Sequence, residues 1–234
     1  MTKSVISISG GLDSVTLLHY IVAQGETVHA LAFDYGQLHT RELECAQWQC
    51  EQLSVPLDII KLPELQRIAS LVSALVNPDI KLPTVQEAMG DPQPASYVPN
   101  RNMLFLAYAV AYAESIGAHN VYYAAQKHDV YGYFDTTPQF VEALNNVYRL
   151  NRKSQLQVLA PFVTKSKADE ILMGLLLGID YGHTWSCYKG GAEACGVCAT
   201  CAERLKGFMD AGLSDPLKYT TLPDSYRQKF PLVQ

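Results

Sequence analysis

The chain has 234 residues, of which 48% are hydrophobic and 18% are charged. This apolar share suffices for a sizeable core, and it excludes a mainly disordered protein, because disordered chains are rich in charge and poor in apolar residues. Lysine and arginine total 18 against 23 for aspartate and glutamate, which gives a net charge of −5. We therefore expect no nucleic-acid partner and no attraction to an anionic membrane.

Nothing in the sequence predicts a targeting signal or a membrane segment. The N-terminal residues run into a short apolar stretch without a recognisable cleavage site. The longest apolar run, residues 103–113, is well short of the roughly 20 residues that a membrane helix needs. We therefore expect a cytoplasmic protein. In that reducing compartment, clustered cysteines indicate metal or redox chemistry more often than disulfides.

Apolar runs typical of buried strands alternate along the chain with segments of helical periodicity. Residues 4–9 predict the first strand, and Asp13 and Ser14 favour the start of a helix that stops at Gly25. Further strands are predicted at residues 27–33, 56–62, 120–125 and 156–160, and further helices at 39–53, 103–115, 139–148 and 167–177. This alternation predicts an α/β fold with a doubly wound, five-stranded parallel sheet.

Three segments depart from this alternation. Residues 76–102 contain five prolines and predict a long loop over a functional site. Residues 185–208 hold four of the six cysteines, and residues 210–234, with three prolines, predict an extended tail. We expect all three segments to belong to a single domain over residues 1–234.

The turn after the first strand, residues 9–14 (Ser-Gly-Gly-Leu-Asp-Ser), is a candidate phosphate site. A helix start at the end of a strand offers unpaired backbone N–H groups and a positive dipole end, and glycines let a phosphate approach. The hydroxyls of Ser9 and Ser14 can add hydrogen bonds. A purely structural turn capped by Asp13 is the alternative. The Walker and Gly-x-Gly-x-x-Gly patterns are absent from the sequence, which excludes those two phosphate loops.

Cys187, Cys195, Cys198 and Cys201 form a C-x7-C-x2-C-x2-C cluster. Four thiolates suffice for one tetrahedral zinc ion, and neighbouring glycines let the chain turn between ligands. A redox pair, an iron–sulfur cluster and buried thiols are the alternatives, because thiolates do not by themselves select the metal. We favour a structural zinc knuckle. The other two cysteines lie on one predicted helix and are interpreted as ordinary small apolar residues.

Residues 9–14 resemble the Ser-Gly-Gly-x-Asp-Ser loop of the PP-loop ATP pyrophosphatases, which implies that they bind the pyrophosphate of ATP. Loop and cysteine cluster together resemble the 7-cyano-7-deazaguanine synthase (QueC) family of the queuosine pathway, over residues 4–208. Matching segments are found at residues 35–43 (Tyr-Gly-Gln-x-His-x-x-Glu-Leu), 98–102 (Val-Pro-x-Arg-Asn), 166–167 (Ser-Lys for the family's Thr-Lys), 184–188 (Thr-Trp-Ser-Cys-Tyr) and 195–201.

The resemblance implies an ATP-dependent, AMP-forming ligase that makes carbon–nitrogen bonds. ATP adenylates the carboxylate of 7-carboxy-7-deazaguanine, ammonia displaces AMP to give the amide, and a second ATP activates the amide oxygen, whose loss leaves the nitrile. Mg²⁺, Zn²⁺ and a homodimeric assembly are implied as well. Because no enzyme nucleophile is needed, catalysis would consist of positioning and charge stabilisation at the α-phosphate.

The resemblance also implies roles for individual residues. The nucleotide would be held by Ile8, Ser9, Gly10, Gly11, Leu12, Asp13, Ser14, Tyr35 and Gln37. The catalytic groups would be Asp13, which would reach magnesium, together with Ser14, Arg101 and Lys167. The substrate would be bound by Asn102, Asp129, Tyr133 and Asp135. A solvated position for Lys167 and a structural clamp at Arg101 are the alternatives.

Residues 129–140 depart from the family pattern, because Thr136, Thr137 and Gln139 stand where the family typically has Cys, Arg and Glu. Thr137 replaces a cation and Gln139 replaces an anion, which is the change expected if an ion pair were removed. The segment follows the fourth predicted strand and could line the substrate pocket. A diverged relative of phage or antiviral defence is therefore an alternative. It would stop at the amide or couple the activated deazaguanine to a protein amine.

Two other classes of protein share parts of the pattern. A tRNA-modifying PP-loop enzyme would have the same ATP loop, and a thiolating one would use a Cys-x-x-Cys pair, but a net charge of −5 argues against a tRNA-binding surface. A non-catalytic zinc-binding module would leave the glycine turn without a purpose.

Overall fold

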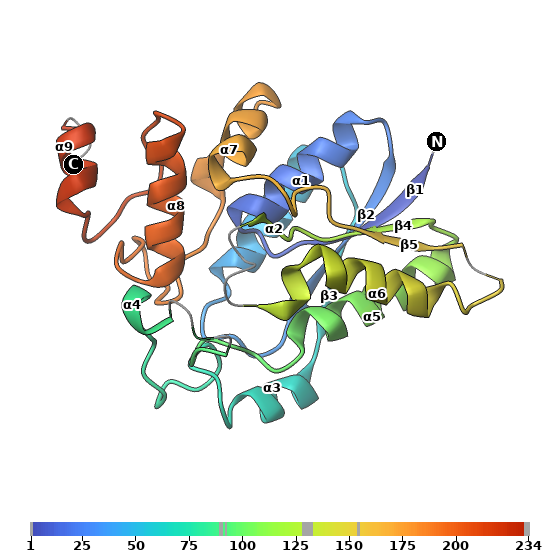
Figure 1. Cartoon of the computed structure of the whole chain (residues 1–234). Helices are drawn as coiled ribbons and strands as arrows, with labels where there is room; N and C mark the ends of the chain where they lie inside the picture. The colour runs from blue at the N-terminus through green and yellow to red at the C-terminus, as the bar shows by residue number, and fades with distance from the viewer. Residues whose placement is uncertain (1, 89–90, 92, 128–132, 154, 232–234) are drawn as a thin grey trace.

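The computed structural model describes residues 2–88, 91, 93–127, 133–153 and 155–231, and it has the predicted α/β architecture (Figure 1). The strands pair in parallel in the order β3-β2-β1-β4-β5. They are β1 (Lys3–Ser7), β2 (Thr27–Asp34), β3 (Leu57–Lys61), β4 (Asn120–Tyr122) and β5 (Gln157–Leu159). The five-stranded parallel sheet is therefore confirmed.

Helices cover both faces of the sheet, as a doubly wound fold requires (Figure 1). The helices on one face are α1 (Leu12–Ala23), α2 (Arg41–Gln52) and α7 (Lys167–Leu176). Those on the other are α3 (Pro63–Ala69), α5 (Arg101–Ile116) and α6 (Pro138–Tyr148). Successive strand residues point to opposite faces, so Ile6 and Ala32 pack with the first group, whereas Val5 and Phe33 pack with the second. Burial on both faces explains the continuous apolar strands.

Local signals explain several helix boundaries. The Ser166 hydroxyl accepts a hydrogen bond from the backbone N–H of Asp169, whose carboxylate accepts one from the N–H of Ser166, so the two residues form a capping box at the start of α7. α5 ends at Gly117, whose φ of +68° favours glycine. Pro138 stands in the first turn of α6, where its missing N–H is not needed.

Four described helices lie where the sequence patterns predict none. They are α3, α4 (Val85–Ala88) inside the proline-rich loop, α8 (Ala199–Asp210) behind the cysteine cluster, and α9 (Asp224–Lys229). Two short 3-10 helices, η2 (Phe134–Thr136) and η3 (Tyr181–His183), were not predicted either. α5 begins two residues earlier than predicted, so Arg101 and Asn102 belong to a helix and not to the loop.

The C-terminal residues do not form the extended tail that their prolines predict. The Arg204 guanidinium of α8 bonds both carboxylate oxygens of Asp215, at 2.7 and 3.0 Å, and both side chains are almost fully buried. Tyr226 of α9 is buried too, and its hydroxyl oxygen accepts a hydrogen bond from the backbone N–H of Asp215. Because an unpaired buried charge is costly, this pair fixes the path of the tail along α8.

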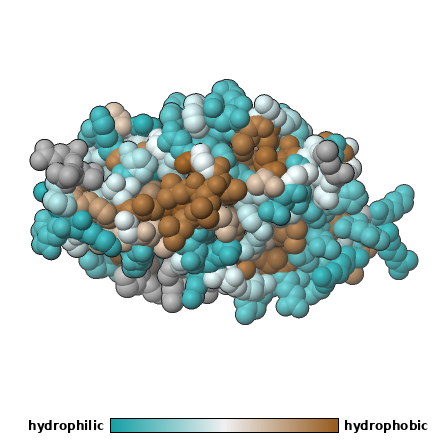
Figure 2. Space-filling view, turned by 90° about the horizontal axis from the view of Figure 1, so that it is seen from above, coloured by the Kyte–Doolittle hydropathy of each residue, from teal (hydrophilic) through white to brown (hydrophobic). Residues whose placement is uncertain are grey.

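The face seen from above in Figure 2 carries an apolar patch near its middle. On this side lies α7, uppermost in Figure 1, which exposes Leu172, Leu175 and Leu176. These leucines occupy one side of a single short helix. No helix in the described part of the chain combines the length and apolar character of a membrane span.

Candidate functional site

The glycine turn stands at the carboxyl edge of the sheet, directly after β1. β1 lies between β2 and β4, and the strand order reverses its direction at this point. Such a switch point is where open α/β sheets form a ligand crevice. β2 and β4 end at the same edge, because both pair in parallel with β1. The segments with Tyr35, Gln37 and Asp135 follow these two strands. The fold therefore brings the predicted residues toward one region.

Gly10 is required by the packing of the turn. Its φ is +87°, and a Cβ at this position would lie 1.9 Å from the carbonyl oxygen of Glu42. The carbonyl oxygen of Gly10 accepts a hydrogen bond from the N–H of Trp185 at 3.0 Å. The turn is thus held between the start of α2 and the segment that precedes the cysteine cluster.

Two serine hydroxyls tie the turn together. Ser14 Oγ accepts a hydrogen bond from the N–H of Ser9 and donates one to the carbonyl oxygen of Gly11, while Ser9 Oγ accepts one from the N–H of Gly11. The N-cap of α1 is Gly11, which has no side chain to cap the helix, so within the described protein its first N–H groups are left for solvent or a ligand. The side chains of Ile8 and Leu12 are buried in the core, so these residues can meet a nucleotide only through their backbone.

Asp13 does not cap α1 but pairs with Lys167, the first residue of α7. Lys167 Nζ lies 2.8 and 2.9 Å from the two carboxylate oxygens. The Lys167 side chain is only 12% exposed, so it is not the solvated surface lysine of the alternative interpretation. Its stem packs on α8, where a Cβ on Gly207 would lie 2.7 Å from Lys167 Cγ. Two predicted catalytic charges therefore meet beside the glycine turn.

Arg101 lies at the start of α5, over the ring of Tyr35. Its guanidinium carbon is 5.9 Å from the ring centroid, and one N–H donates to the Tyr35 hydroxyl at 3.4 Å. Among the described residues, no carboxylate oxygen lies within 4.0 Å of this guanidinium. The Tyr35 ring orients the Arg101 guanidinium, which has no ion-pair partner among the described residues. Such a cation suits the binding of an anionic ligand.

Gln37 fixes the end of β2. Its side-chain oxygen accepts a hydrogen bond from the N–H of Tyr35, and its side-chain nitrogen donates to the carbonyl oxygen of Phe33 and, at 3.4 Å, to the Glu42 carboxylate. The sequence interpretation did not include Glu42 among the site residues. Its place in the matching segment 35–43 was the signal that could have identified it. Glu42 lies in the first turn of α2 and also feels the charge of Arg101.

Asp135 is the buried acid of the segment after β4. It is 3% exposed, and its Oδ1 atom has no hydrogen-bond partner in the described protein. Burial raises the pKa of this carboxyl group, while the charge of Arg101 and a hydrogen bond from Asn102 oppose the rise. Because buried polar atoms are nearly always paired, the orphaned oxygen indicates a place for a ligand donor.

Thr136, Thr137 and Gln139, which depart from the family pattern, have local surroundings that suit their side chains. The Thr137 hydroxyl caps α6, accepting a backbone N–H at 3.1 Å. Thr136 donates to the carbonyl oxygen of Tyr133, and Gln139 is exposed. Asp129, another predicted substrate residue, lies outside the described residues.

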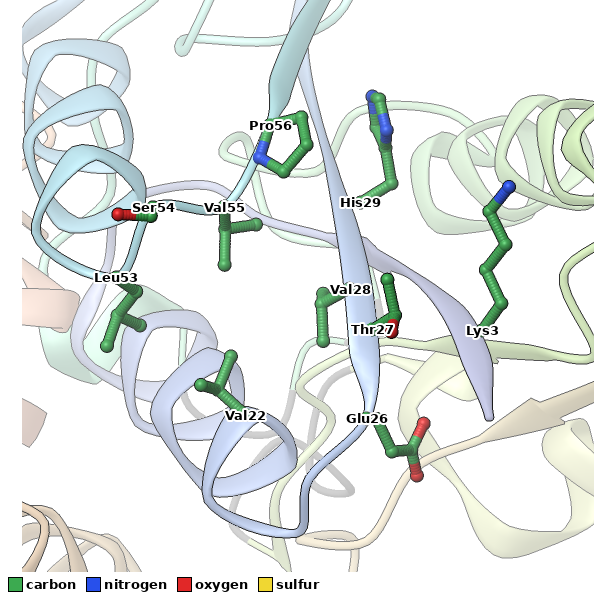
Figure 3. A pocket seen from close by; sticks show the side chains of 10 residues that line it. All are labelled: Lys3, Val22, Glu26, Thr27, Val28, His29, Leu53, Ser54, Val55 and Pro56. Carbon is green, nitrogen blue, oxygen red and sulfur yellow. The ribbon is translucent and has the colours of Figure 1, made fainter. Parts of the chain in front are cut away.

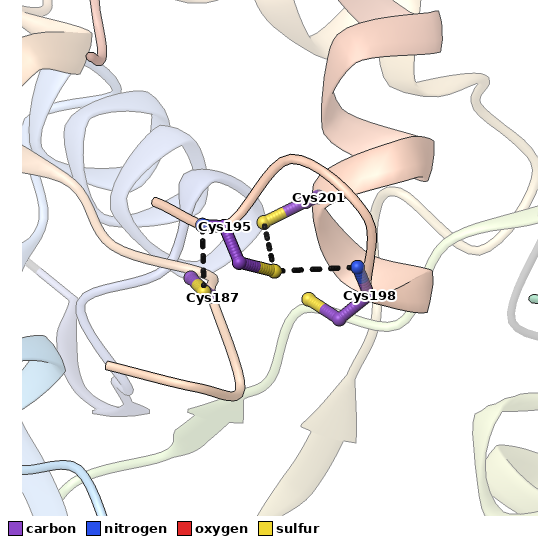
Figure 4. Close-up of side chains that lie close together, drawn as sticks. All are labelled: Cys187, Cys195, Cys198 and Cys201. Carbon is purple, nitrogen blue, oxygen red and sulfur yellow. Dashed lines mark hydrogen bonds between the residues drawn. The ribbon is translucent and has the colours of Figure 1, made fainter. Parts of the chain in front are cut away.

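The four predicted metal ligands come together in a buried cluster (Figure 4). Their Sγ atoms all lie within 4.8 Å of one another. In a tetrahedral zinc site with Zn–S bonds of about 2.3 Å, sulfur atoms lie about 3.8 Å apart, which these positions can meet with small shifts. The N–H of Cys195 donates to Cys187 Sγ, and the N–H of Cys198 donates to Cys195 Sγ. These bonds favour thiolates, so the cluster is a candidate metal centre.

Residues 219–221 of the C-terminal tail pack against the cysteine cluster, and the segment that precedes the cluster packs against the glycine turn. Ala194 forms a parallel bridge with Tyr219 of the tail. Gly196 has a φ of +75°, and a Cβ there would lie 1.6 Å from the carbonyl oxygen of Thr221. Trp185, which bonds the turn, stands two residues before the first ligand. A change in the cysteine cluster would therefore be transmitted to the glycine turn.

Two pockets lie at opposite ends of the strands, one at the amino ends and one at the carboxyl ends. One of about 300 Å³ lies at the amino ends of β1 and β2, among Lys3, Glu26 and residues 53–56 (Figure 3). Its lining is largely aliphatic, and Glu26 already accepts a hydrogen bond from Tyr122. Another, of about 440 Å³, opens at the carboxyl edge between the start of α2 and Gly190. The candidate site residues lie at the carboxyl edge.

Comparison with known proteins identifies the family. The sequence matches the family "Queuosine biosynthesis protein QueC" over residues 3–212. A 7-cyano-7-deazaguanine synthase of Thermoplasma acidophilum is 40% identical, over 96% of this chain and 95% of the relative. The one of Methanoregula boonei is 42% identical, over 93% of this chain and 99% of the relative. The solved structure of an NMN synthetase from Francisella tularensis shares the fold, with a TM-score of 0.51 and 14% identity over 97% of this chain and 81% of that chain. This chain therefore belongs to the QueC family of queuosine biosynthesis proteins.

Proposed function

We propose that this chain is a 7-cyano-7-deazaguanine synthase, an AMP-forming ligase that uses ATP and ammonia to convert 7-carboxy-7-deazaguanine to the nitrile. One observation carries the proposal. The glycine turn with its Asp13–Lys167 pair stands at the sheet edge that also holds Arg101, which has no carboxylate oxygen within 4.0 Å among the described residues. The chain is about 40% identical to enzymes of that name. The diverged, tRNA-modifying and non-catalytic alternatives are not favoured.

ATP would bind with its phosphates over residues 8–14. The N–H groups at the start of α1, where the N-cap Gly11 offers no side-chain cap, would meet the pyrophosphate, and the hydroxyls of Ser9 and Ser14 would shape the turn around it. Lys167 would neutralise charge that develops on the α-phosphate and the leaving pyrophosphate. Tyr35 and Gln37, at the end of β2, would line the place of the adenosine or of the deazapurine.

The acid substrate would bind on the side of α5. Arg101 would pair with the carboxylate and orient it toward the α-phosphorus. Asp135, whose Oδ1 lacks a partner in the described protein, would accept N–H groups of the aminopyrimidinone ring, and Asn102 and Tyr133 would complete the pocket with Asp129. A buried carboxylate oxygen suits a ligand that offers donors, because an unmet partner would be costly.

The reaction follows from this placement. The substrate carboxylate attacks the α-phosphorus and pyrophosphate leaves. Ammonia attacks the activated carbonyl carbon, and AMP leaves with the electron pair of the broken C–O bond. The amide oxygen then attacks a second ATP in the same way, and loss of AMP and of the N–H protons gives the nitrile. The protein supplies proximity and fixed charge, and no covalent enzyme intermediate is required.

The metals would have separate tasks. Zn²⁺ would be held by Cys187, Cys195, Cys198 and Cys201, whose soft donors and spacing fit it, and it would stabilise the knuckle. Mg²⁺ would accompany ATP, and its preference for oxygen ligands suits the carboxylate of Asp13.

A defined reaction tests the function. The zinc-loaded protein is incubated with ATP, Mg²⁺, 7-carboxy-7-deazaguanine and ammonium, and the products are identified by mass spectrometry. The nitrile, together with AMP, is the expected product. An amide that does not react further, or mass added to protein, would instead support a diverged acceptor.

The assembly and setting of the enzyme are part of the proposal. We expect one domain over residues 1–234, acting in the cytoplasm as a homodimer. Sedimentation analysis at several protein concentrations measures the oligomeric state directly, and a concentration-independent monomer would contradict the dimer.

A further inference from the structure

Glu42 has a position that the roles assigned above do not use. Its backbone carbonyl oxygen touches the glycine turn, where a Cβ on Gly10 would lie 1.9 Å away. Its carboxylate accepts a hydrogen bond of 3.4 Å from Gln37 Nε2 at the end of β2. The side chain is neither fully buried nor fully exposed. It therefore stands between the glycine turn and the strand end that carries Tyr35.

The surroundings of Glu42 bring the pKa of its carboxyl group close to neutral pH. Burial raises the pKa of the carboxyl group to about 7, although the charge of Arg101 and the hydrogen bond from Gln37 oppose the rise. The groups that face it from other elements are Arg101 on α5 and Tyr35 and Gln37 after β2, and on its own helix Cys45 feels its charge. In the described residues, no cationic nitrogen lies within 4.0 Å of its carboxylate.

The other acids at this edge are less suited to accept a proton. Asp13 is held by Lys167 at 2.8 and 2.9 Å. Asp34 accepts a hydrogen bond from the N–H of Gly36 at the strand end. Asp135 is 3% exposed and lies in the segment proposed to hold the ring. Glu42 and Asp34 are both partly exposed, and neither has a cationic partner within ion-pair distance in the described protein. Of these two acids, it is Glu42 whose backbone contacts the glycine turn.

The chemistry at this edge requires a proton acceptor. Ammonia that has attacked an acyl adenylate carries a positive charge, and it must lose a proton before a stable amide forms. The conversion of an activated amide to a nitrile releases N–H protons as well. A side chain whose pKa lies near the operating pH is the most effective acceptor.

We propose that the Glu42 carboxylate is the general base that removes the proton from the attacking nitrogen. This inference rests on the proposed function. As the nitrogen lone pair forms the C–N bond, the C–O bond to AMP breaks and AMP leaves with the electron pair. One N–H proton passes to Glu42, which becomes a neutral carboxylic acid and returns the proton to solvent. The same group then takes an N–H proton when the activated amide loses AMP.

The decisive experiment compares two steps in Glu42→Gln, which keeps the shape and the Gln37 contact but cannot accept a proton. Exchange of labelled pyrophosphate into ATP, driven by the acid substrate without ammonia, measures adenylation. Amide formation in a single turnover, at a fixed concentration of free ammonia, measures nitrogen transfer. We expect exchange to remain near the wild-type rate and amide formation to fall by about 100-fold or more, the usual contribution of a general base. Glu44→Gln, an exposed acid in the same turn of α2, is the matched control and should alter neither step.

The outcomes separate the inference from the function on which it rests. No exchange in the wild-type protein would refute the proposed function itself. With wild-type exchange present, an unchanged rate of amide formation in Glu42→Gln would refute the general base. An equal loss of exchange and amide formation would also refute it, because Glu42 would then act on the ATP turn. The pH profile adds a further check: at constant free ammonia, the wild-type rate of nitrogen transfer should rise through a pKa near 7, and this limb should vanish in the variant.

Discussion

Lys167 Nζ lies 2.8 and 2.9 Å from the two carboxylate oxygens of Asp13, although 154 residues separate them in the sequence. Asp13 stands in the first turn of α1 and Lys167 in the first turn of α7, so the pair joins two helix N-termini at the glycine turn. A phosphate that arrives here would meet N–H groups and a lysine already held in position. Such preorganisation is the chief means by which a protein accelerates phosphoryl and nucleotidyl transfer.

The Asp13–Lys167 pair and the turn make the first prediction. Asp13→Ala combined with Ser14→Ala, and separately Lys167→Met, should each lower substrate-dependent AMP formation by about 100-fold or more, because fixed charge at the reacting phosphate is lost. AMP release is followed by chromatography. Lys206 and Asp210 form an exposed lysine–aspartate pair, so Lys206→Met is the matched control and should leave the rate of AMP formation unchanged. AMP formation that survives the double variant would place the phosphate site elsewhere.

Arg101 makes a prediction about the acid substrate. Arg101→Met should raise the KM for 7-carboxy-7-deazaguanine by about 10- to 100-fold, the equivalent of a hydrogen bond to a charged group. Arg101→Lys should be intermediate, because it keeps the charge but loses the planar fork. Steady-state kinetics with saturating ATP measures the change. Arg149, which is exposed directly after the end of α6, supplies the control Arg149→Met. An unaltered KM in Arg101→Met would leave the structural clamp as its role.

The cysteine cluster makes a prediction about metal and stability together. The purified protein should contain one zinc ion per chain by elemental analysis, and Cys198→Ser should lose it. The variant should also bind ATP more weakly, because Trp185, just before the cluster, bonds the carbonyl oxygen of Gly10. Cys50→Ala is the control: Cys50 is buried on α2 and does not belong to the group of four clustered thiols, so zinc should be retained. Iron with labile sulfide in place of zinc would contradict the proposed metal.

The buried ion pair between Arg204 of α8 and Asp215 of the tail leads to a prediction about the free energy of unfolding. Asp215→Ala should lower the free energy of unfolding by about 3–5 kcal/mol, because it leaves the Arg204 charge buried without its partner. The double variant Arg204→Leu with Asp215→Leu should lose less than the single one, since it buries no charge. Urea titration measures both, with Asp210→Ala on the surface of the same helix as the control. A larger loss in the double variant than in Asp215→Ala would show that packing dominates over charge here.

The raised pKa of Glu42 makes a prediction about pH-dependent stability. The folded-state pKa of about 7 lies above the ordinary value of 4.5, so between these values the folded state binds more protons than the unfolded state. Stability therefore falls as pH rises through this window. Glu42→Gln cannot ionise and therefore avoids this loss of stability. The Tm of the variant minus the Tm of the wild type should be smallest near pH 4.5 and largest above about pH 7. Thermal melts across the window measure the difference. A Tm difference that does not depend on pH would contradict the raised pKa.

The core alternation of strands and helices was predictable because each element carries its own periodicity and its own boundary residues. The run before Gly10 and the capping Ser166 are local signals, and both elements appear where they were expected. α3, α8 and α9 were not predicted, because their stability depends on surfaces they contact. The tail is the clearest case: its prolines favour extended chain locally, but the Arg204–Asp215 pair and buried Tyr226 dock it on α8.

The sequence by itself determined the glycine turn, the four-cysteine cluster and the family, because these depend on residue types at fixed short spacings. Only the tertiary structure decided which charges meet. It paired Asp13 with Lys167, kept Arg101 apart from carboxylates in the described residues, and set Glu42 against Gly10. The physical reason is that electrostatic interactions act through space and depend on burial. A linear sequence specifies neither the distance between two distant side chains nor the water between them.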